Sequence, residues 1–146
     1  MRDMTPSEVA EQLVAQAAYV ANGHTGTPAD FSEACLCGQD FIGQDLSGAD
    51  FSSSSLANVN APGANFTGCS FAGAQLSCMT AAGANFTGCS FAGAQLSSCN
   101  LTGAVFSGAD LASCTWVCHE MLSSGAVLDG AIIAVGGLRA TIVYEA

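Results

Sequence analysis

The sequence predicts an all-β solenoid in which the chain turns a corner every five residues. Residues 63–77 and residues 83–97 are identical, which shows a period of 20. A shorter period lies beneath it: of the 19 positions at every fifth residue from Phe31 to Met121, 17 are Phe, Leu, Trp or Met. Five matches neither the helix period of about 3.6 nor the strand period of about 2. Each unit must therefore turn a corner, and four units must close one coil.

The residue two positions before the large residue is Ala or Cys in most units, as a filled interior requires. Val59 and Met79 are too large for that position, but each is followed two residues later by Ala61 or Ala81. In these two units the large and the small residue exchange positions, which keeps the packed volume constant. We therefore predict four inward ladders, stacked at the strand spacing of about 4.8 Å. Their large residues are Leu46, Phe66, Phe86 and Phe106; Phe31, Phe51, Phe71, Phe91 and Leu111; Leu36, Leu56, Leu76, Leu96 and Trp116; and Phe41, Ala61, Ala81, Leu101 and Met121.

Two stretches of the repeat resemble a known motif. Residues 45–51, DLSGADF, and residues 108–111, GADL, are similar to the A-(D/N)-L-x-x unit of the pentapeptide-repeat family. The resemblance covers roughly residues 29–146. It implies a right-handed four-sided β-helix in which the large residue and the small residue two before it point inward. The motif is specific for the fold and says little about function.

The ends of such a rod need a cover, because stacking stops there. Thr5, Pro6 and Glu8 form a capping box with Pro at the first helical position. They predict a helix over residues 6–21, which would cap the first coil. Its apolar stripe comprises Val9, Leu13, Ala17 and Val20, widened by Ala10 and Val14. Residues 1–28 are thus expected to form the capping helix and linker, and residues 29–146 the β-helix.

The five-residue spacing shifts by two after Met121, which places a bulge near residues 122–125 and predicts about six coils in all. The later centres are Leu128, Ile133, Leu138 and Val143. The last segment has no polar cover, so it forms a β-prone edge that invites another chain. The residues of this edge are Ile142, Val143 and Tyr144.

The composition excludes several partners. With two Arg, 12 acidic residues and a formal charge of −10, the chain has no basic surface for nucleic acid or for an anionic membrane. It contains no apolar run of about 18 residues, and no basic segment precedes an apolar core near residue 1. We expect neither a transmembrane segment nor a signal peptide, and a location in the cytoplasm or a virion.

The sequence contains no catalytic constellation. His24 lies in the linker and His119 near the bulge, and no Ser-His-Asp or Cys-His arrangement has an orienting third group. Cys114, Cys118 and His119 have zinc-ligand side chains, but the repeat phase points the two cysteines apart. We therefore expect no enzyme activity, no cofactor and no metal.

The eight cysteines fall into two groups according to their position within the five-residue unit. Those at the small inward position are expected to be buried, reduced thiols that fill an Ala-sized site. They are Cys69, Cys89, Cys99 and Cys114. The others point outward and are candidates for disulfides to another chain. They are Cys35, Cys37, Cys78 and Cys118.

The charge is uneven along the chain, since residues 51–109 contain no charged residue. A neutral surface of small side chains suits close packing against another protein. We therefore expect a structural or interaction protein that binds another protein, or copies of itself. The contacts would be the uncharged outer surface of residues 51–109, called the middle faces, and the C-terminal edge. A decoration, cement or tail component of a phage particle, locked by disulfides, is one version.

Two alternatives stay open. Family members of the quinolone-resistance type are acidic rods that mimic DNA and bind DNA gyrase. The net charge supports that reading, while the uncharged middle opposes it, because a mimic needs acids along the whole rod. An outward hydroxyl ladder would suit binding of ice or a carbohydrate surface. It comprises Ser47, Thr67, Thr87 and Ser107.

Overall fold

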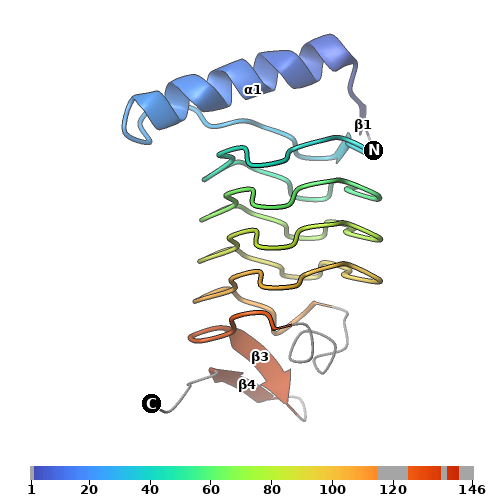
Figure 1. Cartoon of the computed structure of the whole chain (residues 1–146), viewed down its shortest axis with the longest axis vertical. Helices are drawn as coiled ribbons and strands as arrows, with labels where there is room; N and C mark the ends of the chain where they lie inside the picture. The colour runs from blue at the N-terminus through green and yellow to red at the C-terminus, as the bar shows by residue number, and fades with distance from the viewer. Residues whose placement is uncertain (1, 115–124, 136–137, 142–146) are drawn as a thin grey trace.

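The computed structural model describes residues 2–114, 125–135 and 138–141. Its elements are β1 (Arg2–Asp3), α1 (Pro6–Ala21), β2 (Ala34–Cys35), β3 (Ile132–Val135) and β4 (Leu138–Thr141). Figure 1 shows a stack of similar coils, with α1 lying across one end and β3 and β4 at the other. The chain is therefore a rod whose two ends are built differently.

Each coil has four sides, and parallel backbone bridges join each side to the next coil. One column of bridges runs through Asp45, Asn65, Asn85 and Val105. Between bridges the chain turns a corner: the amide of Ala49 donates to the carbonyl of Leu46 at 3.1 Å, with Gly48 at a φ of 75°. A left-handed residue at this position completes the turn, and Gly adopts it without a steric penalty. The predicted corner every five residues is confirmed.

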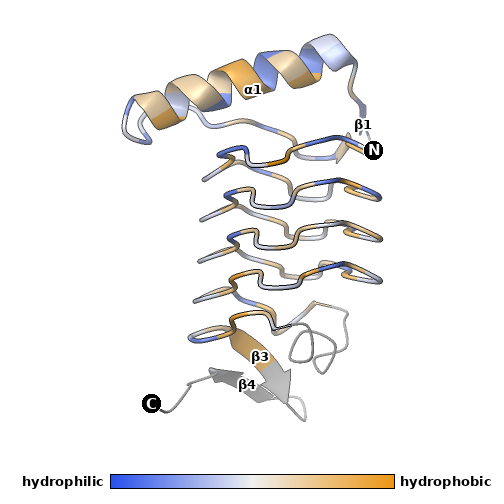
Figure 2. Ribbon diagram, viewed as in Figure 1, coloured by the Kyte–Doolittle hydropathy of each residue, from blue (hydrophilic) through white to orange (hydrophobic). Residues whose placement is uncertain are grey.

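The interior is filled by the predicted ladders. The rings of Phe51 and Phe71 stack with centroids 5.1 Å apart, and those of Phe66 and Phe86 lie 5.0 Å apart. Both distances are close to the spacing of neighbouring strands, about 4.8 Å. Hydrophobic and hydrophilic residues alternate along the coils (Figure 2). The inward ladders are thus confirmed for the described residues, while Trp116 and Met121 lie outside them.

The exchanged pairs also lie inside the rod. Val59, Ala61, Met79 and Ala81 have no exposed surface. The large side chain thus moves to the neighbouring inward position while the total volume is retained, as the sequence predicted.

This packing predicts a specific pattern in a double-mutant cycle. Ala81→Phe alone should overpack the interior and lower the free energy of unfolding by about 1–3 kcal/mol. Adding Met79→Ala should recover most of that loss, because the two side chains share one space. Urea unfolding followed by circular dichroism measures both effects. Additive losses in the double mutant would contradict the shared space.

The two-residue shift in spacing is present near the C-terminal end. Val105 pairs with Val127, and Asp110 pairs with Ile132, each 22 residues later instead of 20. Leu128 is buried as the next large residue of its ladder. The proposed location of the extra residues, 122–125, falls almost entirely outside the described part of the chain.

Beyond Ile133 the predicted coil does not continue. β3 pairs with β4 in antiparallel register, with Val135 opposite Leu138. Leu138 therefore belongs to a hairpin and is not the centre of a further five-residue unit. The sequence between the strands is Gly-Gly, and two glycines between apolar runs favour a tight hairpin over a solenoid corner. Val143 lies outside the described residues.

The predicted helix is α1, and its capping box is present. The amide of Glu8 donates to Thr5 Oγ1 at 3.2 Å, and the amide of Thr5 donates to the Glu8 carboxylate at 2.7 Å. Val9 is buried and Leu13 packs against the core. The expectation that Ala10 and Val14 widen the apolar stripe is wrong, since both side chains are exposed, that of Val14 to 70%. Ala17, which was expected in the stripe itself, is exposed as well. The helical period turns Val14 away from the face that carries Val9 and Leu13.

Candidate interaction surface

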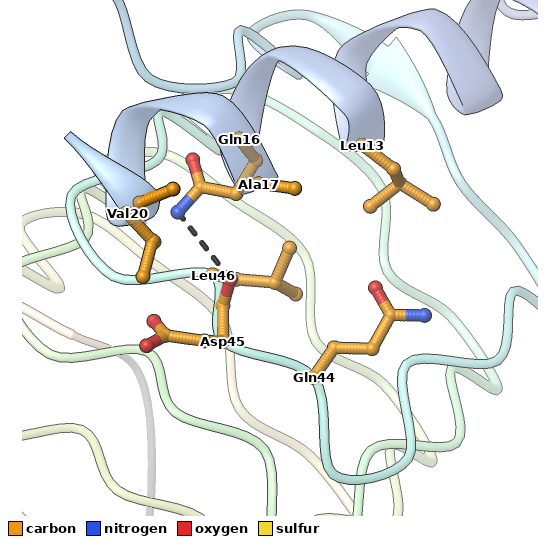
Figure 3. Close-up of a pocket in the computed structure, with 8 residues that line it drawn as sticks. Leu13, Gln16, Ala17, Val20, Gln44, Asp45 and Leu46 are labelled. Carbon is orange, nitrogen blue, oxygen red and sulfur yellow. Dashed lines mark hydrogen bonds between the residues drawn. The ribbon is translucent and has the colours of Figure 1, made fainter.

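The contact between α1 and the first coil is built around a buried glutamine. Gln16 is 1% exposed. Its Oε1 accepts from the amide of Ala29 at 2.9 Å, and its Nε2 donates to the carbonyls of Ser47 at 2.8 Å and Asp45 at 3.4 Å. The side chain reaches from the helix to the coil beneath it (Figure 3). Gln16 thus pairs backbone groups that would otherwise lie buried and unsatisfied.

Replacing Gln16 should therefore cost more than a surface substitution. Gln16→Leu is expected to lower the free energy of unfolding by about 2–4 kcal/mol, because buried backbone groups lose their partners. The matched control is Gln12→Leu: Gln12 Oε1 also accepts a backbone amide, from Asp30, but at an exposed site, where water can replace it. Equal losses in urea unfolding would contradict the special role of Gln16.

A shallow groove of about 360 Å³ runs beside Gln16. Leu13 and Val20 of the helix face Leu46 of the coil across it, with Gln44 and Asp45 at its edge (Figure 3). The groove shows that α1 covers the end coil only in part.

The structure brings together His24, Ser47 and Asp45, which the sequence left apart. His24 Nε2 lies 2.8 Å from Ser47 Oγ, and Ser47 Oγ donates to Asp45 Oδ1 at 2.6 Å. The carboxylate holds the serine and does not orient the histidine, which a Ser-His-Asp triad would require. Burial raises the pKa of Asp45, but its hydrogen bonds with Ser47 and the nearby His24 outweigh this and lower it. The cluster is a corner contact that fastens the linker.

The outward columns show where charge lies on the rod. One column runs through Asp30, Asp50, Ser70, Ser90 and Asp110. The acids at its start are hydrogen-bonded locally: the Ser32 hydroxyl and amide donate to Asp30 and lower the pKa of that carboxyl. Such contacts stabilise the fold at neutral pH, and their contribution is lost as the pH falls through the lowered pKa. The middle of the column is neutral.

The hydroxyl ladder is tied to its own corners. Thr67 Oγ1 donates to Asn65 Oδ1 at 2.6 Å, and Thr87 Oγ1 donates to Asn85 Oδ1 at 2.5 Å. These hydroxyl hydrogens are therefore already used within the chain.

Two inward cysteines are fully enclosed. Cys69 and Cys89 are each 1% exposed, and their thiols donate to the carbonyls of Leu46 at 3.0 Å and Phe66 at 2.8 Å. Burial raises the pKa of the Cys69 thiol. A buried, protonated thiol is a poor nucleophile, so these positions are suited to packing.

Cys99 and Cys114 were predicted to be buried, but they are only half-buried. Both side chains still pack against the hydrophobic core, so they point inward as predicted. Cys118 and His119 lie outside the described residues, as do Ile142, Val143 and Tyr144. In the part that is described, no group of three or more His, Cys, Asp or Glu side chains could hold a metal ion.

The outward cysteines differ in their surroundings. Cys37 and Cys78 are exposed and Cys35 is half-buried, and all three are free thiols. Cys35 Sγ and Cys37 Sγ lie 3.4 Å apart. The repeat phase predicted that both point outward, but it did not predict that they touch.

Comparison with known proteins identifies the family. A family model described as pentapeptide repeats matches residues 45–77 and 82–115 in eight copies. Residues 45–77 and 82–115 are pentapeptide repeats of this family. Members of this family form right-handed four-sided β-helices, and the coils described above have this architecture. Across the described residues, no helix has the length and apolar character that crossing a bilayer would require.

A solved structure with a TM-score above 0.5 supports the fold. A pentapeptide-repeat protein from Nostoc Pcc 7120 is 20% identical with a TM-score of 0.51, and the match covers 86% of this chain and 96% of that one. One from the Arabidopsis thaliana thylakoid lumen is 27% identical over 64% of each chain, with a TM-score of 0.38. QnrB1, a plasmid-mediated fluoroquinolone resistance protein, is 27% identical with a TM-score of 0.32, over 74% of this chain and 59% of that one. No curated protein sequence matches.

Proposed function

We propose that this pentapeptide-repeat protein is a non-catalytic rod that packs against another protein, or against copies of itself, through its uncharged middle faces. The supporting observation is that residues 51–109 carry no charge, although they form the outer surface of several successive coils. Charged groups resist removal from water, and the core of a protein interface is depleted of them. A neutral rod side with short side chains therefore has a low cost of burial.

A finer version is a decoration, cement or tail component of a phage particle that is locked by a disulfide. Among the described outward thiols, Cys78 best fits an inter-chain bond, because it is exposed and lies within the uncharged segment. Cys118 is a second candidate, outside the described residues. The C-terminal segment with Ile142, Val143 and Tyr144 is a second proposed contact.

In this proposal α1 is a cap that directs association to the sides of the rod. Val9 and Leu13 pack on the core at the end of the rod, and Gln16 pairs backbone groups there. An uncovered end would offer both apolar surface and unpaired backbone groups to another chain.

Charge introduced into the middle faces tests the proposal in its simplest form, self-association. Ala72 and Ala92 stand two residues after Ser70 and Ser90, which pair with each other on neighbouring coils. The double variant Ala72→Glu with Ala92→Glu therefore places two carboxylates on the same side of the rod. Association should weaken by about tenfold or more, because both charges would have to be buried unpaired. Sedimentation velocity over a concentration series measures it. Ile42→Glu, on the already acidic first coil, is the control. Equal effects of the two variants would contradict the middle faces as the contact.

The alternatives have weaker support. A DNA mimic that binds gyrase has the net charge of −10 in its favour, but Ser70 and Ser90 interrupt the acidic column between Asp50 and Asp110. An ice or carbohydrate binder needs free hydroxyl groups, whereas those of Thr67 and Thr87 are engaged.

A further inference from the structure

Two outward cysteines on the first coil lie in contact. Cys35 ends β2, and Cys37 follows it after the buried Leu36. Alternation along an extended chain places the side chains on either side of Leu36 on the opposite, outer face, and their Sγ atoms are 3.4 Å apart. Cys35 is held in place from both sides, because its backbone pairs with Asp3 of β1 and with Ser55 of the next coil.

The two thiols have different surroundings. Cys37 is exposed, and its Sγ lies 3.3 Å from Ser55 Oγ. The hydrogen bonds with Ser55 and then with Cys35 lower the pKa of Cys37. A thiol that is both accessible and more readily ionised is the better nucleophile, so Cys37 is suited to attack and the half-buried Cys35 to follow.

We propose that Cys35 and Cys37 form a redox-active dithiol that a low-molecular-weight disulfide converts into an intrachain disulfide. The Cys37 thiolate attacks one sulfur of the small disulfide, which forms a mixed disulfide and releases one thiolate. Cys35 then loses its proton and attacks Cys37 Sγ, which releases the second thiolate. The protein loses two electrons and two protons, and the small disulfide is reduced to two thiols.

Contact between the thiols favours ring closure over a bond to another chain. The second thiol is already at contact distance from the first, so its effective concentration exceeds that of any thiol on a separate molecule. A disulfide between residues two apart closes a small ring on the surface, and exposed or strained disulfides are the readily reduced ones. The reaction is therefore expected to be reversible. This behaviour distinguishes the pair from Cys78, which is the candidate for an inter-chain bond.

Exchange with oxidised glutathione tests the proposal on the folded full chain. After incubation, free thiols are blocked with N-ethylmaleimide without reductant, and the chain is mapped by chymotryptic peptides and mass spectrometry. We expect Cys35 and Cys37 to escape alkylation together in a monomeric chain, linked to each other and free of glutathione, and to regain alkylation after added dithiothreitol. Stable glutathione adducts on either residue, a Cys35 or Cys37 bond to a second chain, or full alkylation of both would overturn it.

Single substitutions identify the roles of the two sulfurs. Cys35→Ser should trap glutathione on Cys37, because no second thiol remains to release it. Cys37→Ser should react more slowly, and Cys78→Ser should leave closure unchanged. Closure that persists in Cys35→Ser or Cys37→Ser would show that another cysteine is the partner. If a variant does not fold, the peptide map of the chain without substitutions still shows whether the Cys35–Cys37 disulfide forms.

Discussion

Replacing Phe71 with Ala is expected to lower the free energy of unfolding by about 3–5 kcal/mol. Phe71 has no exposed surface, and its ring stacks between those of Phe51 and Phe91, with both centroid distances at 5.1 Å. Phe66 and Phe86 meet its ring from the side at 5.5 and 5.8 Å. Bridged backbone encloses this space, so the cavity left by Ala should collapse little. Urea unfolding monitored by circular dichroism measures the loss.

A matched variant separates volume from aromatic stacking. Phe71→Leu keeps most of the volume and should lose less than half as much stability as Phe71→Ala. Ala72→Ser, at the half-buried neighbouring corner, should change stability by about 0.5 kcal/mol or less. A loss below about 1 kcal/mol in Phe71→Ala would contradict a filled interior.

Removing residues 1–22 is expected to convert the chain into self-associating material. The deletion takes away Gln16 and the apolar contacts of Val9 and Leu13, which lie on the core at the end of the rod. The uncovered coil would expose apolar side chains and unpaired backbone, both of which favour contact with another chain. Size-exclusion chromatography with light scattering, and thermal unfolding, measure the result.

The control for this deletion retains the helix and changes only its outer face. Val14→Asp replaces a 70% exposed side chain, so it should alter neither the mass in solution nor the unfolding temperature by more than a few degrees or so. A truncated chain that keeps the same mass in solution and the same heat stability as the full chain would show that α1 is not a cap.

The interior could be predicted from the sequence because the five-residue spacing of large side chains and the need to fill the interior are the same in every coil. Phe51, Phe71 and Phe91 recur in one phase, and closure of a coil every 20 residues forces them to stack. The exchange of Met79 and Ala81 was visible for the same reason, since constant volume is a local constraint. Capping residues such as Thr5 and Glu8 also act locally, so the helix bounds followed from them.

The features that the sequence did not reveal lie where contacts join distant or non-repeating segments. Gln16 is polar and sits in an apolar stripe, and only the nearby Ala29 and Ser47 explain it. The hairpin of β3 and β4 competes with a continued coil, and the apolar spacing alone did not distinguish them. The contact of Cys35 with Cys37 depends on how the two side chains are oriented at one corner. The position of a residue within the five-residue repeat does not specify that orientation.

Site-specific photo-crosslinking in the native host tests the central claim, that the uncharged middle faces are the binding surface. A photoreactive amino acid is placed at Ala92 in the middle and, as the matched site, at Glu33 on the acidic first coil; both positions are on the outer side of the chain. We predict that position 92 forms a covalent adduct with a discrete protein, or with a second copy of this chain, and that position 33 does not. Adducts at position 33 with none at position 92 would contradict the claim and favour recognition through the acidic end.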